Sequence, residues 1–259
     1  MIPGFILLLR ALVLLLLALR TSVLLATDFD HGHPAFAKIL AANVTNGVVD
    51  YASLKAAPSE LRSYLTALSE VPRGEFEKWS REQRLAFLIN LYNAATLQLI
   101  VDYYPVPSIR KIGSLLKGPW KQEVVGFQGG RITLDRLEHE LIRPVFSEPR
   151  IHFALVCAAR SCPPLRSEPF VAGRLGAQLD DQARVFLAQS DKNRIDRAAK
   201  TLWLSPIFDW YGSDFTQDGR SIVDYVADHL PASDASDLKR GGFRVRHTEY
   251  DWSLNDRPR

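Results

Sequence analysis

The chain has 259 residues, of which 47% are hydrophobic and 24% charged, and its formal net charge is +3. This composition is typical of globular proteins and argues against long disordered stretches. Two of the positive charges, Arg10 and Arg20, lie in an N-terminal segment without acidic residues, so the rest of the chain is nearly neutral. It therefore has no strongly basic face, and we expect no nucleic-acid partner.

Residues 1–26 are apolar apart from those two arginines. The run Ala11 to Leu19 has the length of a signal-peptide core, and Ala26 could close a cleavage site. A retained membrane anchor is the alternative, but its span would carry an arginine into the hydrocarbon, which is unfavourable. We expect an exported protein, periplasmic or membrane-anchored and facing outside the cytoplasm. Membrane contact would then occur only through this segment if it is not cleaved.

After the leader, residues 34–256 predict a single globular domain. Its first helices are expected at 34–43 and 58–69. A much stronger helix is expected at 81–104, where Ser80 caps the N-terminus and Gln83 completes a capping box. Its apolar residues cover nearly every side, which predicts a helix buried in the core.

Two amides, Asn90 and Asn93, are three residues apart on this helix and so lie on the same side. A buried amide without a partner costs about 1–3 kcal/mol. We therefore expect the pair either to tie loops to the helix or to face a polar cavity.

Next, residues 122–133 read as a hairpin around Gly129 and Gly130, and Thr133 caps a helix over 134–146. Glu138 falls near the centre of the apolar stripe of this helix, and His139 lies toward its edge. A carboxylate in that position should be paired or have a raised pKa.

Both cysteines of the protein lie in one segment, RIHFALVCAARSCPPLR at 150–166. The apolar run 151–157 predicts a buried strand, on which Cys157 faces the core and His152 faces the other way. Cys162 follows between Ser161 and a proline pair, where a strand cannot continue. We expect it to be the more exposed thiol.

The remaining chain predicts a helix at 172–189, a strand pair at 193–204, an aromatic segment at 207–215, a helix at 220–230 and a strand at 243–247. Together these elements predict an α+β fold with one domain. In it, the long buried helix packs against a mixed or antiparallel sheet that includes 151–157.

Seven ordered segments resemble the domain of unknown function 547 family. They are VDYASLK (49–55), AFLINLYNAATL (86–97), GPW (118–120), ITLDRLEHELIR (132–143), RIHFALVCAARSCPPLR (150–166), IFDWYGSDF (207–215) and YDWSLN (250–255). The resemblance covers residues 36 to 255, with one departure at Leu88, where a tryptophan is expected. It implies a fold but no established reaction, and it agrees with an exported or envelope location.

One chemical hypothesis is a cysteine-dependent hydrolase or acyl transferase, which needs a thiolate, an imidazole and a group that orients the imidazole. Cys162 would supply the thiol, His139 or His152 the imidazole, and Glu138 or Glu140 the orienting carboxylate. On a strand, His152 would lie about 16 Å from Cys157, because each residue spans roughly 3.3 Å, so those two could not touch. Cys162 could return to His152 only if the chain between Cys157 and Cys162 doubles back fully, so His139, brought in by folding, is an equal candidate for the base.

Other chemistries lack their motifs. His139 and Glu140 are followed by Arg143, so the HExxH zinc pattern is absent, and the cysteine pair has no second ligand pair. The pair also lacks the close CxxC spacing of redox motifs. Neither a phosphate-binding glycine loop nor GxSxG occurs. We therefore expect no metal and no cofactor.

The alternative is a non-catalytic structural or binding protein of the envelope, in which Cys157 and Cys162 are bridged or buried. In the catalytic hypothesis, the 134–146 helix and the 158–164 loop meet at a polar pocket. Its ligand would be an unidentified small molecule or peptide. The residues that we expect to bind this ligand are Asn90, Asn93, Arg150, Arg160 and Ser161.

Overall fold

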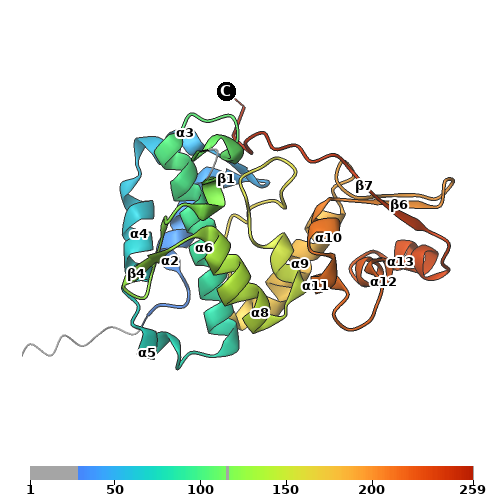
Figure 1. Ribbon diagram of the computed structural model, residues 1–259, viewed down its shortest axis with the longest axis horizontal. Coiled ribbons are helices and arrows are strands. Elements are labelled where there is room, and N and C mark those ends of the chain that lie inside the picture. The colour runs from blue at the N-terminus through green and yellow to red at the C-terminus, as the bar shows by residue number, and fades with distance from the viewer. Residues whose placement is uncertain (1–28, 115–116, 259) are drawn as a thin grey trace, which may run out of the picture. The chain divides into compact units, whose positions relative to one another are not determined.

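The long helix α6 (Arg81–Tyr103) is the centre of the structure, a computed structural model that describes residues 29–114 and 117–258 (Figure 1). Ser80 and Gln83 form the expected capping box. Every side chain from Leu85 to Val101 is buried except that of Gln98. The helix is long and apolar enough to cross a membrane, but 89% of its most hydrophobic window is buried inside the protein. In this structure α6 is thus a core helix, as the sequence predicted.

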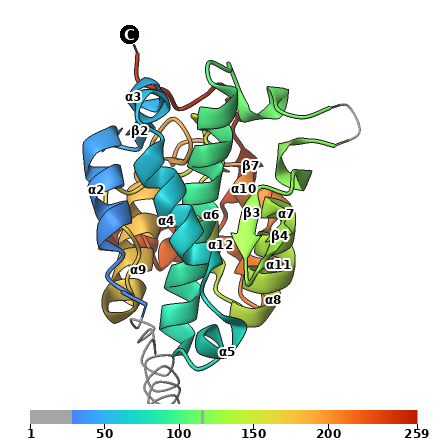
Figure 2. The same cartoon turned by 90° about the vertical axis from the view of Figure 1, so that its left-hand side faces the viewer.

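Four helices that precede α6 in the chain lie near it. In Figure 2 α2 and α4 run beside α6, and α3 and α4 contact it directly. The predicted helices at 34–43 and 58–69 are confirmed. The elements of this part are α2 (Pro34–Asn43), β1 (Val44–Thr45), β2 (Val48–Val49), α3 (Tyr51–Ala56), α4 (Ser59–Ser69) and α5 (Arg73–Phe76).

A hairpin and an irregular helix follow α6, after two 3-10 turns, η1 (Ile109–Lys111) and η2 (Pro119–Lys121). Strands β3 (Val125–Phe127) and β4 (Gly130–Ile132) pair antiparallel. Thr133 then caps α7 (Leu134–Arg136), accepting the Arg136 N–H at 2.9 Å. The expected 134–146 helix is present, but its middle is a π-helical turn, η3 (Leu137–Ile142), before α8 (Arg143–Phe146). Such turns are frequent at functional sites.

The predicted strand at 151–157 is wrong. Residues Pro149–Phe153 form a 3-10 helix, η4, and an irregular loop follows. The backbone of this loop is paired by a side chain instead of a neighbouring strand, because Asn93 donates to Ala154 O at 2.9 Å and accepts from Val156 N at 2.9 Å. The apolar run marks burial, and a helix amide supplies the hydrogen bonds.

The second half of the chain builds a three-stranded sheet covered by helices. Strand β6 pairs antiparallel with β5 and parallel with β7. An aromatic cluster that includes Phe153, Phe186 and Phe208 fills the space beside the sheet. The elements are η5 (Ala172–Arg174), α9 (Leu175–Leu187), β5 (Arg194–Asp196), β6 (Thr201–Leu204), α10 (Ile207–Trp210), α11 (Gly212–Phe215), α12 (Ile222–Ala227), α13 (Ala232–Lys239) and β7 (Arg244–His247).

The C-terminal segment after β7 returns to the helices near the N-terminal end of the described chain (Figure 1). Leu254 pairs with Ala159 and Asp256 with Val49 in isolated bridges. Asn255 accepts a hydrogen bond from the Tyr51 hydroxyl at 2.8 Å. Residues His31–Arg259 form one compact unit, and the fold is α+β with a long buried helix, as predicted. The expected leader, residues 1–26, lies outside the described residues.

Candidate functional site

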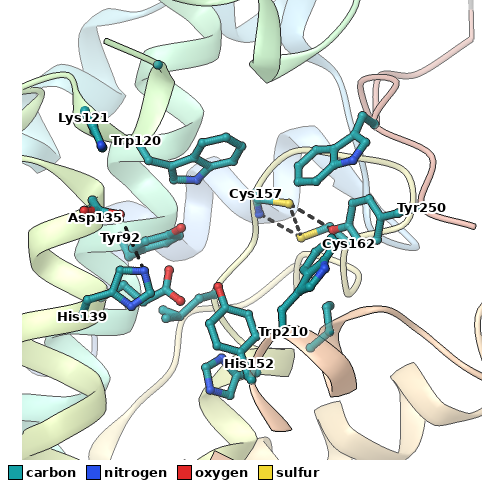
Figure 3. Close-up of a pocket in the computed structure, with 16 residues that line it drawn as sticks. Tyr92, Trp120, Lys121, Asp135, His139, His152, Cys157, Cys162, Trp210 and Tyr250 are labelled. Carbon is teal, nitrogen blue, oxygen red and sulfur yellow. Dashed lines mark hydrogen bonds and ion pairs between the residues drawn. The ribbon is translucent and has the colours of Figure 1, made fainter. Parts of the chain in front are cut away.

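A pocket of about 480 Å³ opens where six segments of the chain meet (Figure 3). They are α6, the segment around η2, the 134–146 helix, the segment from η4 to the cysteine loop, the segment around α10 and the C-terminal segment. The pocket brings together four of the predicted site residues, namely Glu138, His139, His152 and Cys162. The residues that line it include Tyr92, Trp120, Glu138, His139, His152, Cys157, Cys162, Trp210, Tyr211, Tyr250 and Trp252.

Two free thiols lie at one wall of the pocket. The sulfur of Cys157 is 2.9 Å from that of Cys162, and the Cys157 N–H donates to the Cys162 sulfur at 2.9 Å. Cys157 is half-buried, whereas Cys162 is buried. This is the reverse of the expected exposure. Because 151–157 is not a strand, the alternation that turned Cys157 toward the core does not apply, and a tight turn from Ala159 O to Cys162 N directs Cys162 inward.

The two sulfurs differ in acidity. The hydrogen bond between the two sulfurs lowers the pKa of Cys157, and the Tyr250 hydroxyl, 3.3 Å away, adds to this. Burial and the neighbouring sulfur raise the pKa of Cys162 well above its ordinary value. The pair therefore loses one proton readily and holds the other. Both cysteines line the pocket, and Cys157 is the less buried of the two and the one whose pKa is lowered. A thiolate is the nucleophilic form of cysteine.

Tyr211 lines the pocket and contacts both His152 and Glu138. Its ring stacks on His152 with 3.9 Å between centroids, and the Arg143 guanidinium lies 4.9 Å from its centre. Burial and a hydrogen bond to Glu138 raise the pKa of the Tyr211 hydroxyl far above its usual range. Tyr211 therefore stays protonated and donates to the buried Glu138 carboxylate.

Asp214 is hydrogen-bonded to both His152 and Arg143, the two residues that pack on the Tyr211 ring. It accepts from His152 Nε2 at 2.7 Å and from two nitrogens of Arg143 at 2.8 and 2.9 Å. The His152 and Arg143 hydrogen bonds lower the pKa of Asp214. Burial lowers the pKa of His152, so its imidazole is neutral and donates its Nε2–H to the carboxylate.

His139 belongs to the same network. Arg143 can only donate hydrogen bonds, so the 2.9 Å contact from its Nη1 makes His139 Nδ1 the acceptor. The proton of a neutral His139 is then on Nε2, which lies 3.6 Å from Asp135. In the described part of the chain no hydrogen bond joins either sulfur to His139 or His152. The expected thiol–imidazole pair is not assembled, and the acidity of Cys157 comes from Cys162 and Tyr250.

The two asparagines fasten loops to α6. Asn90 binds both backbone groups of Phe170, at 2.8 and 2.9 Å. Asn93 binds the loop that leads to Cys157, as described above. Of the two expected possibilities, the structure places both amides in the loop-tying position, outside the pocket wall.

The other expected binding residues also lie outside the wall. Arg150 pairs with Glu148 at 2.5 Å and with Asp180 at 2.6 Å. The Ser161 hydroxyl accepts from Asp251 N at 2.8 Å and so anchors the C-terminal segment. Arg160 is exposed, and its N–H also binds that segment.

Sequence reasoning did not assign Tyr211, Asp214 or Tyr250 to the site. The first two lie in the aromatic segment 207–215, where acids alternate with rings, and this pattern could have marked them. Tyr250 opens the segment YDWSLN, one of the seven that carry the family resemblance, and this was its only signal. No group of three or more His, Cys, Asp or Glu side chains that could hold a metal ion occurs among residues 29–114 and 117–258.

A model of the family described as "Protein of unknown function, DUF547" matches residues 76–187. Over this segment the chain is similar to the DUF547 family. The resemblance that the sequence motifs suggested is thereby confirmed over that range. No curated protein and no solved structure gives a significant match to the chain.

The DUF547 segment supplies both sulfurs, Glu138 and the two histidines of the pocket. Tyr211 and Tyr250, which donate hydrogen bonds to Glu138 and to Cys157, come from beyond it. The pocket is therefore built jointly by the DUF547 segment and the C-terminal part of the chain.

Proposed function

We propose that this protein is an exported thiol-dependent hydrolase or acyl transferase in which Cys157, and not Cys162, is the nucleophile. The observation that carries the proposal is the position of Cys157. It lines the pocket, and its sulfur lies 2.9 Å from the Cys162 sulfur and 3.3 Å from the Tyr250 hydroxyl, contacts that lower its pKa. Such a thiolate does not need an adjacent imidazole to be formed, because the thiol and hydroxyl donors already stabilise its charge.

The reaction would proceed through a thioester. The Cys157 thiolate attacks the carbonyl carbon of an ester or amide, the C–O or C–N bond breaks, and the leaving alcohol or amine takes a proton from solvent water. Water or an acceptor nucleophile then attacks the thioester, its proton passes to Glu138 as the C–S bond breaks and the Cys157 thiolate is restored, and Glu138 returns that proton to solvent. Tyr211, which donates to Glu138, orients this base.

The shape of the pocket favours a ligand with a flat or apolar group. Trp120, Trp210 and Trp252 line it together with Tyr250, and Trp210 packs against Trp252 and Tyr250 with 5.8 and 4.9 Å between ring centroids. Aromatic walls contribute a large contact area at low entropic cost. Export is proposed from the apolar leader alone.

The test is to trap the acyl-enzyme. Reduced protein is mixed with excess p-nitrophenyl acetate, and nitrophenolate release and peptide masses are followed. We expect a burst of one equivalent and an acetyl group on Cys157. Cys157→Ala abolishes the burst. Glu138→Gln keeps the burst but slows later turnover, whereas Glu140→Gln, at an exposed neighbouring carboxylate, leaves both unchanged. Absence of a burst, or acetylation only at other residues, overturns the proposal.

The short distance of 2.9 Å between the two sulfurs favours a second candidate, a non-catalytic envelope protein in which they form a disulfide. A thiol count on native, unreduced protein separates the two. No free thiol, together with no burst after reduction, would support the bridged structural protein. One fast-reacting thiol near neutral pH supports the enzyme.

A further inference from the structure

We propose that a groove remote from the thiols binds a single-chain amphiphile with a carboxylate head, such as a fatty acid. The groove has a volume of about 550 Å³ and lies among α5, the β3–β4 hairpin, α6 and α8. These elements are seen in the lower right part of Figure 2. Its volume is within the range of roughly 300–1,000 Å³ that small-molecule sites occupy. The inference does not depend on the proposed function.

The wall of the groove is largely apolar. Phe76, Leu88, Phe127, Leu141, Val145 and Phe146 line it. Val145 is 56% exposed, which is the largest exposed fraction among the bulky apolar side chains of the described residues. A surface of this kind gains free energy when a hydrocarbon chain removes it from water.

Positive charge surrounds this apolar wall. Four arginines line the groove, and Glu77 is the single acid among its lining residues. Two of the arginines are paired locally, Arg73 with Glu77 and Arg136 with Glu140. The other two, Arg84 and Arg131, form no ion pair within the described residues.

Arg84 is the more informative of the two. The side chain is half-buried, and its Nε is buried without a hydrogen-bond partner in the described part of the chain. Leaving a buried donor of a charged group unpaired is costly. Arg131 uses its Nε on the Glu123 carbonyl at 2.8 Å. A carboxylate that enters the groove would pair with the Arg84 guanidinium, the geometry that carboxylates and guanidinium groups favour.

Charge and polarity together select the occupant. A small anion would satisfy Arg84 but leave the apolar wall in water, and a neutral chain would cover the wall but leave Arg84 unpaired. The leader is apolar but carries Arg10 and Arg20 and no acid, so it would place like charges together. A chain with a carboxylate at one end meets both requirements.

The test measures binding of dodecanoate, below its micelle concentration, to the full protein by titration calorimetry. Butyrate has the head without the chain, and dodecyltrimethylammonium has the chain with the opposite charge. We expect saturable binding of dodecanoate with one site per chain and much weaker binding of the other two. Equal binding of dodecanoate and dodecyltrimethylammonium overturns the proposal.

Two variants locate the site. Arg84→Met should weaken dodecanoate binding by about tenfold or more, since a hydrogen bond to a charged group is worth roughly 1.5–3 kcal/mol. Val145→Asp, at an exposed position of α8, should weaken it similarly by adding a negative charge. Arg246→Met, at an exposed arginine of β7, should leave it unchanged. Unaltered binding by both groove variants overturns the proposal, as does binding to anionic phosphatidylglycerol vesicles without any binding of dodecanoate.

Discussion

His152 Nε2 donates a hydrogen bond to Asp214 at 2.7 Å, from an imidazole that burial keeps neutral. In the unfolded chain a histidine has a pKa of about 6.5. Because the pKa of His152 is lower in the folded protein, the unfolded state binds the extra proton first. Stability is therefore full above about pH 6.5 and declines as the pH falls toward the folded pKa.

We expect the free energy of unfolding, measured by chemical denaturation between pH 7 and 5, to decrease with falling pH. His152→Gln should flatten this slope, since it removes the titrating group. His247→Gln, at an exposed histidine of β7, serves as the control and should keep the wild-type slope. If His152→Gln and wild type show the same slope, His152 is not held neutral.

A second prediction concerns the acidity of Cys157. Since the hydrogen bond with Cys162 lowers this pKa, Cys162→Ala should raise it, because the substitution removes that hydrogen bond to the thiolate. The rate of Cys157 alkylation by iodoacetamide is measured by peptide mass at a series of pH values. The inflection of the rate against pH gives the pKa of Cys157. Tyr250→Phe should shift it in the same direction by less. An unchanged inflection in Cys162→Ala would show that another group sets the acidity.

A third prediction concerns the loop before Cys157. Asn93→Ala removes the partners of two buried backbone groups, at Ala154 and Val156. We expect a loss of about 2–4 kcal/mol in the free energy of unfolding. Gln98→Ala changes a half-buried amide of the same helix whose Nε2 donates to the Asp102 carboxylate rather than to a loop, and it should cost clearly less than Asn93→Ala. Similar losses in the two variants would mean that the hydrogen bonds of Asn93 to the loop do not stabilise the fold.

Mild oxidation supplies a fourth prediction. With their sulfurs 2.9 Å apart, Cys157 and Cys162 should close an intramolecular disulfide on treatment with diamide, and both thiols should disappear together. Closing so short a loop is expected to add about 2 kcal/mol to stability. Denaturation with and without reductant measures the gain. Disulfide-linked dimers as the main product would contradict the prediction.

Local signals predicted the helices well. The Ser80–Gln83 capping box predicts where α6 begins, and the apolar residues of 81–104 predict that it is buried. Thr133 likewise predicts the start of the helix that carries Glu138. The strand at 151–157 was wrong because an apolar run shows only that a segment is buried. Whether its backbone bonds to a strand or to Asn93, some sixty residues earlier, is a tertiary property.

The convergence of Glu138, His139, His152 and Cys162 on one pocket was also predicted. The roles of the two cysteines were not, because their exposure depends on the turn between them. Tyr250 reaches Cys157 across 93 positions of sequence, a distance over which no periodicity or spacing carries information.

The parallel pairing of β6 with β7 and the bridges of Leu254 and Asp256 have a consequence for folding. Tyr250 and Trp252, which line the pocket beside the two sulfurs, lie between these contacts in the chain, and contacts of such long sequence separation form slowly. This side of the pocket is therefore completed late in folding. A chain that stops before residue 244 would keep both cysteines and lose the Tyr250 hydroxyl beside Cys157.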